Sequence, residues 1–216
     1  MNQALLNPSA APADHHFPWY AAWTKALLQP SAQTYQTLLA DPSACCTRAF
    51  IWVAAVGLGC AAAITLFGWP GAPAGAATGG APVGGVAQLI AVAVLAPLAA
   101  VLGLAVVAGI PQLTARSLGG RGSFVEMIYA FGAFVAPMGP LALALSLVVT
   151  AYHGGHLFFL NPVLWALTIY GFFVATVIVH AVHGLNARQS LAAVIPAAVI
   201  QILLLICAML ALLTTT

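Results

Sequence analysis

Side chains that could carry out a reaction are scarce in this chain of 216 residues. The three carboxylates are Asp14, Asp41 and Glu126, and no two of them are placed as a paired general acid and base. No Gly-rich loop precedes a Lys-Ser or Lys-Thr pair, and no G-x-S-x-G segment occurs. We therefore expect a protein that is not an enzyme, with no catalytic residues and no cofactor.

The histidines are the best candidates for binding a metal. His180 and His183 are three residues apart, so they share a face at the end of a predicted helix. His153 and His156 have the same spacing, but the predicted span count places them on the opposite side of the membrane. Zinc sites use three or four ligands, and histidines near a helix C-terminus also complement the helix dipole. We assign no metal site and keep His180 and His183 as weak candidates.

The segment from Arg116 to Glu126 joins two apolar stretches and contains a helix-start signal. Ser123 and Glu126 have the spacing of a capping box, in which each side chain binds the other residue's backbone N–H. A helix should therefore begin at Ser123. A second interpretation makes Glu126 an intramembrane carboxylate that relays protons or binds a cation. Arg121 either pairs with Glu126 or faces anionic lipid headgroups.

The surrounding chain has the composition of a membrane protein. It is 63% hydrophobic and 4% charged, with a mean hydropathy of +1.06, whereas soluble domains contain roughly 25% charged residues. The bilayer must be its solvent. We predict an all-α polytopic membrane bundle with five transmembrane helices and a membrane domain over residues 48–213. The predicted spans cover about 48–67, 86–110, 124–150, 162–183 and 189–213, and the second ends before Pro111.

The third and fifth predicted spans contain residues that are unusual at membrane depth. Pro137 and Pro140 lie inside the third span, and two prolines remove two helical donors, so we expect a strong kink or a broken helix. Gln201 places an amide inside the fifth span. Broken helices occur in transporter sites, although prolines also kink structural helices.

The N-terminal part divides into a tail and a short helical segment. Residues 1–17 are predicted to be a flexible tail, and residues 18–47 to form amphipathic helices at the cytoplasmic membrane surface. Trp19 and Trp23 share one helical face, with Lys25 close by, and this combination is typical of a segment in the lipid headgroup region. The alternative is that these helices pack on the cytoplasmic ends of the spans.

Basic residues predict the orientation. With five spans, all five Lys and Arg side chains fall on one side of the membrane, and they are Lys25, Arg48, Arg116, Arg121 and Arg188. Because basic residues favour the cytoplasmic side, the N-terminus should be cytoplasmic and the C-terminus outside. The net charge of +2 is too small to indicate a nucleic acid partner.

Several motifs resemble the Yip1 family of five-span membrane proteins, in its bacterial branch. They are a Pro-Trp segment followed by Gln29-Pro30 and Thr34-Tyr35, the Gly119-to-Glu126 entry to the third span, Pro137, and His183-Gly184-Leu185. The resemblance implies a five-helix bundle with a cytoplasmic N-terminus. Eukaryotic members are linked to Rab GTPases, but this chain lacks the Asp-Leu-Tyr-Gly-Pro motif associated with them, so that role is not carried over.

The expected function is a scaffold or accessory role. We expect a non-enzymatic, multi-pass protein of the bacterial inner membrane that contacts membrane lipid, other membrane proteins or a second copy of itself. The alternative is a small transporter or channel that uses the broken third span. The residues expected to matter are Arg116, Arg121, Ser123, Glu126, Pro137, Pro140, His183, Gly184, Arg188 and Gln201, with Trp19, Trp23 and Lys25 at the interface.

Overall fold

A computed structural model describes residues 17–67, 86–153 and 162–215, and the regular structure of these residues is entirely helical, which confirms the all-α prediction. Most of the predicted tail and the loop with His156 lie outside these ranges. The helices are α1 (Trp19–Leu28), α2 (Ala32–Leu39), α3 (Cys46–Phe67), α4 (Val86–Ser117), α5 (Phe124–His153), α6 (Pro162–His183) and α7 (Ala187–Thr215).

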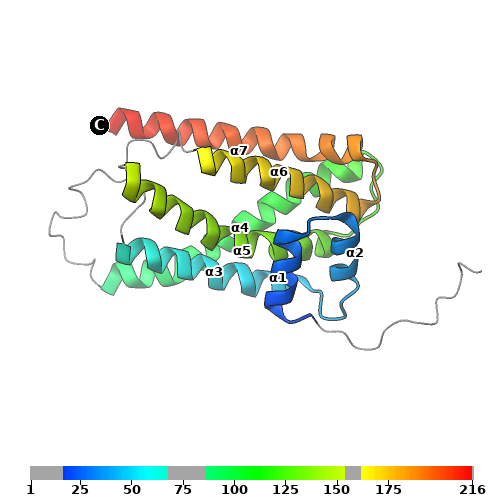
Figure 1. Cartoon of the computed structure of the whole chain (residues 1–216), viewed down its shortest axis with the longest axis horizontal. Helices are drawn as coiled ribbons and strands as arrows, with labels where there is room; N and C mark the ends of the chain where they lie inside the picture. The colour runs from blue at the N-terminus through cyan, green and yellow to red at the C-terminus, as the bar shows by residue number, and fades with distance from the viewer. Residues whose placement is uncertain (1–16, 68–85, 154–161, 216) are drawn as a thin grey trace, which may run out of the picture.

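The five long helices form one antiparallel bundle. Figure 1 shows that α3 to α7 lie along one axis and alternate in direction, whereas α1 and α2 lie across that axis at one end. Helix α1 packs on α5, and α2 packs on α6 and α5. All five basic residues belong to this same end, where α3 begins, α4 and α6 end, and α5 and α7 begin. We call it the basic end, defined by Lys25, Arg48, Arg116, Arg121 and Arg188.

The long helices present apolar side chains outward, as expected for a protein dissolved in lipid. Ile51 on α3, Leu102 on α4 and Ile169 on α6 are 62%, 57% and 68% exposed. Within the described residues, four helices are long and apolar enough to cross a membrane, and these are α3, α4, α5 and α6. Helix α7 has a shorter apolar stretch, Ala187–Leu203, within the described residues. The fifth span therefore stays a prediction.

One expectation about proline is wrong, and one of two alternatives for another is excluded. The second predicted span was expected to end before Pro111, but α4 continues through this residue to Ser117. The third was expected to be kinked strongly or broken, and it is not broken, because α5 is one continuous helix through Pro137 and Pro140. A proline removes only its own N–H from the helical ladder, and the flanking turns are held by packing against neighbouring helices.

Close packing is concentrated toward the basic end. In α3 the buried residues Ala49, Trp52 and Val53 all fall in its first turns. Gly132 on α5 lies against α3 so closely that an added Cβ would come within 2.6 Å of the Ala49 Cβ. Among the side chains of α7 that the structure describes, the buried ones include Ser190 and lie near the start of the helix. The best-packed part of the bundle thus holds the loops and polar side chains considered next.

Candidate functional site

Three groups from distant parts of the chain form a buried hydrogen-bonded ring at the basic end. The Gly122 N–H donates to Nδ1 of His183 at 3.1 Å, and the Gln112 side-chain amide donates to the Gly122 carbonyl at 3.1 Å. Nε2 of His183 lies 2.8 Å from Oε1 of Gln112. Because Nδ1 accepts a hydrogen bond, the ring proton is on Nε2, which donates to Gln112. We call Gln112, Gly122 and His183 the polar latch, because it joins α4, the α4–α5 loop and α6.

Glycines make this latch possible by letting the α4–α5 loop approach α6. A Cβ on Gly120 would lie 2.6 Å from Nδ1 of His183, and a Cβ on Gly122 would lie 2.5 Å from the carbonyl oxygen of Val182. Gly119 and Gly184 instead have φ values of 91° and 65°, in the left-handed region that favours glycine. Gly120 and Gly122 are therefore needed for close contact with α6, whereas Gly119 in the α4–α5 loop and Gly184 in the α6–α7 turn are needed for their backbone conformation.

The capping box predicted at the start of the third span is confirmed. The Ser123 N–H donates to the Glu126 carboxylate at 2.7 Å, and the Glu126 N–H donates to the Ser123 hydroxyl at 3.2 Å. The carboxylate also accepts from the Ser123 hydroxyl. Glu126 is exposed in the first turn of α5, so its geometry matches the helix-start interpretation and not a carboxylate inside the bundle.

The other basic residues near the latch are exposed. The side chains of Arg116, Arg121 and Arg188 make no hydrogen bond or ion pair within the part of the chain that the structure describes. The pair that was considered between Arg121 and Glu126 is therefore not formed. These guanidinium groups surround the polar latch at the end of the bundle without taking part in it.

Both candidate metal ligands have protein partners. Nδ1 of His180 bonds the Leu185 carbonyl, and both ring nitrogens of His183 belong to the polar latch. Among the described residues, no group of three His, Cys, Asp or Glu side chains is placed to hold a metal ion. The His180 ring fastens the α6–α7 turn, since its bond to Leu185 crosses that turn and Gly184 lies inside it.

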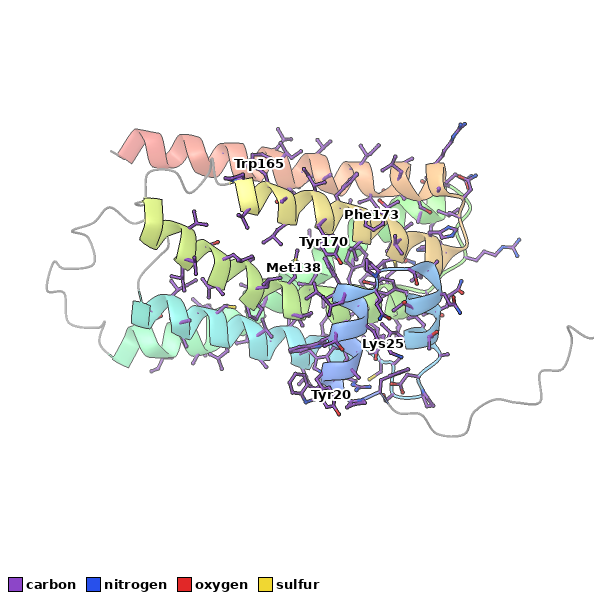
Figure 2. The ribbon with its side chains drawn as sticks, in the orientation of Figure 1. Tyr20, Lys25, Met138, Trp165, Tyr170 and Phe173 are labelled. Carbon is purple, nitrogen blue, oxygen red and sulfur yellow. The ribbon has the colours of Figure 1, made fainter. Side chains whose placement is uncertain are left out.

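A second set of contacts holds the short N-terminal helices against the bundle. The Tyr170 hydroxyl on α6 donates to the Leu27 carbonyl, and the Tyr35 hydroxyl donates to the Ala26 carbonyl at 3.1 Å. Figure 2 shows Tyr170 beside the end of α1. The last carbonyls of a helix have no partner within it, so these tyrosines supply the missing donors. Ala22 and Ala26 are fully buried on the contacting face.

Aromatic rings continue this contact toward α3 and α5. The ring centroids of Trp23 and Trp52 are 6.0 Å apart, and those of Trp52 and Tyr129 are 5.6 Å apart. Trp19, by contrast, is 53% exposed. Trp23 therefore fits the interpretation in which this segment packs on the ends of the spans. Trp19 faces outward and fits the interpretation in which the segment lies in the lipid headgroup region.

One ion pair secures the connection between α2 and α3. Arg48 lies 3.4 Å from the Asp41 carboxylate, which also accepts from the N–H groups of Ser43 at 2.8 Å and Phe17 at 2.9 Å. Burial alone would raise the pKa of Asp41. The hydrogen bonds from Ser43 and Phe17 and the charge of Arg48 outweigh burial and hold that pKa below its ordinary value. The Arg48 guanidinium also lies 4.8 Å over the Trp52 ring.

The remaining predicted site residues are not brought together with the latch. Pro137 is partly buried inside α5, and Pro140 lines an apolar groove of about 250 Å³ beside Gly59 and Ala63 of α3. Gln201 is exposed on α7, well beyond the latch. The predicted residues therefore belong to separate places in the fold.

Two residues that organise the site were missed from the sequence. Gln112 is 4% exposed and central to the latch, and Tyr170 anchors α1. An amide directly after Pro111 in an apolar run was a usable signal, because buried polar groups need partners. Tyr170 carried no such signal, since a tyrosine in a span is ordinary.

The arrangement is suited to holding segments together. The partners of His183 are an amide side chain and a backbone N–H, so no nucleophile is activated by this ring. In comparisons with known proteins, the family model described as the Yip1 domain matches residues 25–209, which is most of the chain. No curated protein and no solved structure matches.

Proposed function

This chain belongs to the Yip1 domain family, and from this premise we propose that it is a non-enzymatic membrane scaffold that works through contacts with other membrane proteins and with lipid. The family and the four long apolar helices make it a multi-pass membrane protein. The scaffold role is our proposal. It is supported by the polar latch, whose groups bond to one another, and by the exposed surface of α7 around Gln201.

We also propose the finer topology. Helix α7 is taken as the fifth span, which gives a membrane domain over 48–213 preceded by interfacial helices in 18–47 and a tail in 1–17. The basic end then faces the cytoplasm of a bacterial cell, with the N-terminus on that side of the inner membrane and the C-terminus outside. The gathering of all five basic residues at one end supports this orientation.

The observation that carries the scaffold proposal is the exposure of α7 in the part of the helix that lies far from the basic end. Five consecutive residues, Val199–Leu203, are all exposed, and five residues at 100° each cover every side of a helix. Among them is Gln201, about 21 Å along the helix axis from Ala187 at 1.5 Å per residue.

An amide at this depth would be costly facing lipid alone. Its side chain bonds nothing within the part of the chain that the structure describes. An unpaired amide in hydrocarbon is costly, and interhelical hydrogen bonds from Gln are a common device for joining membrane helices. We infer that Gln201 bonds a helix of another membrane protein or of a second copy.

The transporter alternative has lost its main support. It depended on a broken third span, and α5 is continuous. Glu126, its candidate ion-binding carboxylate, is exposed and engaged with Ser123.

The test is the composition of the native particle. Membranes containing the full-length protein are solubilised gently, and the mass of the particle is measured for the wild type and for Gln201→Leu. Gln36→Leu is the matched control, because Gln36 is an exposed glutamine on α2, away from the spans. We expect a particle larger than one chain that becomes smaller with Gln201→Leu and is unchanged with Gln36→Leu. A wild-type particle of one chain, together with solute flux in liposomes of the pure protein, would refute the proposal.

A further inference from the structure

A polar cleft lies between the end of α1 and the start of α2. Its volume is about 560 Å³, within the range of roughly 300–1,000 Å³ found for small-molecule sites. The polar side chains that line it are Lys25, Gln29, Ser31, Gln33, Thr34 and Thr37. The cleft is separate from the polar latch and from the Gln201 surface.

Lys25 provides the only charge in the lining of this cleft. Its ammonium group lies 4.2 Å over the Phe17 ring and has no hydrogen bond or ion pair within the described residues. The described carboxylates are Asp41, which is bonded to Arg48, Ser43 and Phe17, and Glu126, which is bonded to Ser123. Within the described residues, the lining of the cleft is therefore electropositive and contains no carboxylate.

Two amide side chains line the same cleft as this ammonium. The side chains of Gln29 and Gln33 line the cleft and make no hydrogen bond within the described part of the chain, so both can donate to a ligand. The Ser31 hydroxyl is already used at the start of α2, where it accepts from the Thr34 N–H at 3.1 Å. One cation with two uncommitted amides suits an oxyanion such as a phosphate diester.

The exposed aromatic residues of α1 place the cleft at the membrane surface. Trp19 and Tyr20 are 53% and 58% exposed, and Trp and Tyr concentrate where headgroups meet hydrocarbon. Figure 2 shows Tyr20 and Lys25 in the region of α1 and α2, the two helices that lie across the bundle. A helix in this position brings its polar side to the depth of lipid phosphates.

We propose that this cleft binds the phosphate of an anionic phospholipid headgroup, with the Lys25 ammonium as counter-charge and the Gln29 and Gln33 amides as hydrogen-bond donors. The inference depends on the proposed cytoplasmic orientation of the basic end, and it does not depend on the contacts of Gln201. The bound lipid would hold α1 and α2 at the cytoplasmic leaflet, whose anionic lipids attract basic residues.

The experiment measures lipid binding to the full-length protein in a mild detergent by native mass spectrometry. The protein is titrated with phosphatidylglycerol and, separately, with phosphatidylcholine. We expect tighter binding of phosphatidylglycerol, and a loss of about fivefold in its affinity with Lys25→Gln. Gln33→Leu should also weaken this lipid, because it removes a donor without changing the charge.

Arg188→Gln is the matched control. It removes the same charge from an exposed, unpaired side chain at the basic end but outside the cleft, so it should leave the affinity unchanged. Equal losses with Lys25→Gln and Arg188→Gln would mean a general surface potential and would overturn the site. No preference for phosphatidylglycerol would overturn it as well. Displacement of the lipid by millimolar inorganic phosphate would assign the cleft to a free anion instead.

The oligomer test with Gln201→Leu is independent of this outcome. A failed lipid site with an intact Gln201 effect would leave the scaffold proposal standing, and the reverse result would leave the lipid site standing.

Discussion

Replacement of Gly122 by alanine tests the polar latch most directly. The added Cβ would lie 2.4 Å from Cγ1 of Val182 and 2.5 Å from its carbonyl oxygen, whereas contacting carbon atoms are favourable at about 3.5–4.0 Å. The loop would have to withdraw by about 1 Å, and most of that movement would separate Gly122 from His183 and Gln112.

The expected cost follows from these contacts. Overpacking at a tight position costs about 1–3 kcal/mol, and each hydrogen bond lost contributes about 0.5–1.5 kcal/mol. Gly122 takes part in two bonds of the latch, so Gly122→Ala should lower the free energy of unfolding by about 2–6 kcal/mol. Gly59→Ala is the control, because a Cβ there meets nothing within 4 Å. Within α3 that change should stabilise by up to about 1 kcal/mol.

The assay is the unfolding midpoint of each purified variant in one detergent, followed by circular dichroism during titration with sodium dodecyl sulfate. A double variant with Gln112→Leu adds a second check. Because both changes break the same ring, their combined effect should be smaller than the sum of the single effects. An unchanged midpoint for Gly122→Ala, or strict additivity with Gln112→Leu, would refute the latch.

Three further predictions concern other contacts. Tyr170→Phe removes the donor to the Leu27 carbonyl, so hydrogen exchange in α1 should become faster while exchange in α7 stays unchanged. The native pKa of Asp41 is lowered, so its stabilising effect is present above the unfolded pKa of about 3.9 and is lost as the pH falls through the native pKa. Acid titration of stability should therefore be shallower in Asp41→Asn than in the wild type. Glu126→Gln should change the free energy of unfolding by no more than about 0.5 kcal/mol, since Gln also completes a capping box, whereas Glu126→Ala should lower it by about 1 kcal/mol. A larger loss with Gln than with Ala would contradict the capping role.

Local patterns were sufficient for much of the fold. The apolar stretches predicted helices whose starts agree with α5 and α6 at Phe124 and Pro162, because the membrane forces each span to bond its own backbone. The capping box was predictable because Ser123 and Glu126 are three residues apart and meet within one turn. The basic residues fell on one end because alternating helix directions follow from the number of spans.

Local patterns failed where packing overrides propensity. Proline lowers the helix propensity at Pro111 and Pro137, yet both residues lie inside continuous helices. A local rule counts the lost hydrogen bond but not the neighbouring helices that hold the flanking turns in place.

By itself, the sequence determined that this is an all-helical membrane protein, because hydropathy and helix-start signals act over a few residues. Only the tertiary structure decided which groups meet. His183 bonds Gln112 across 71 residues, and Tyr170 bonds Leu27 across 143. Such partners depend on which helices are neighbours and on how they are rotated. Gln112 and Gly122 acquire their roles only when α4 and the α4–α5 loop pack on α6, and Tyr170 only when α1 lies against α6.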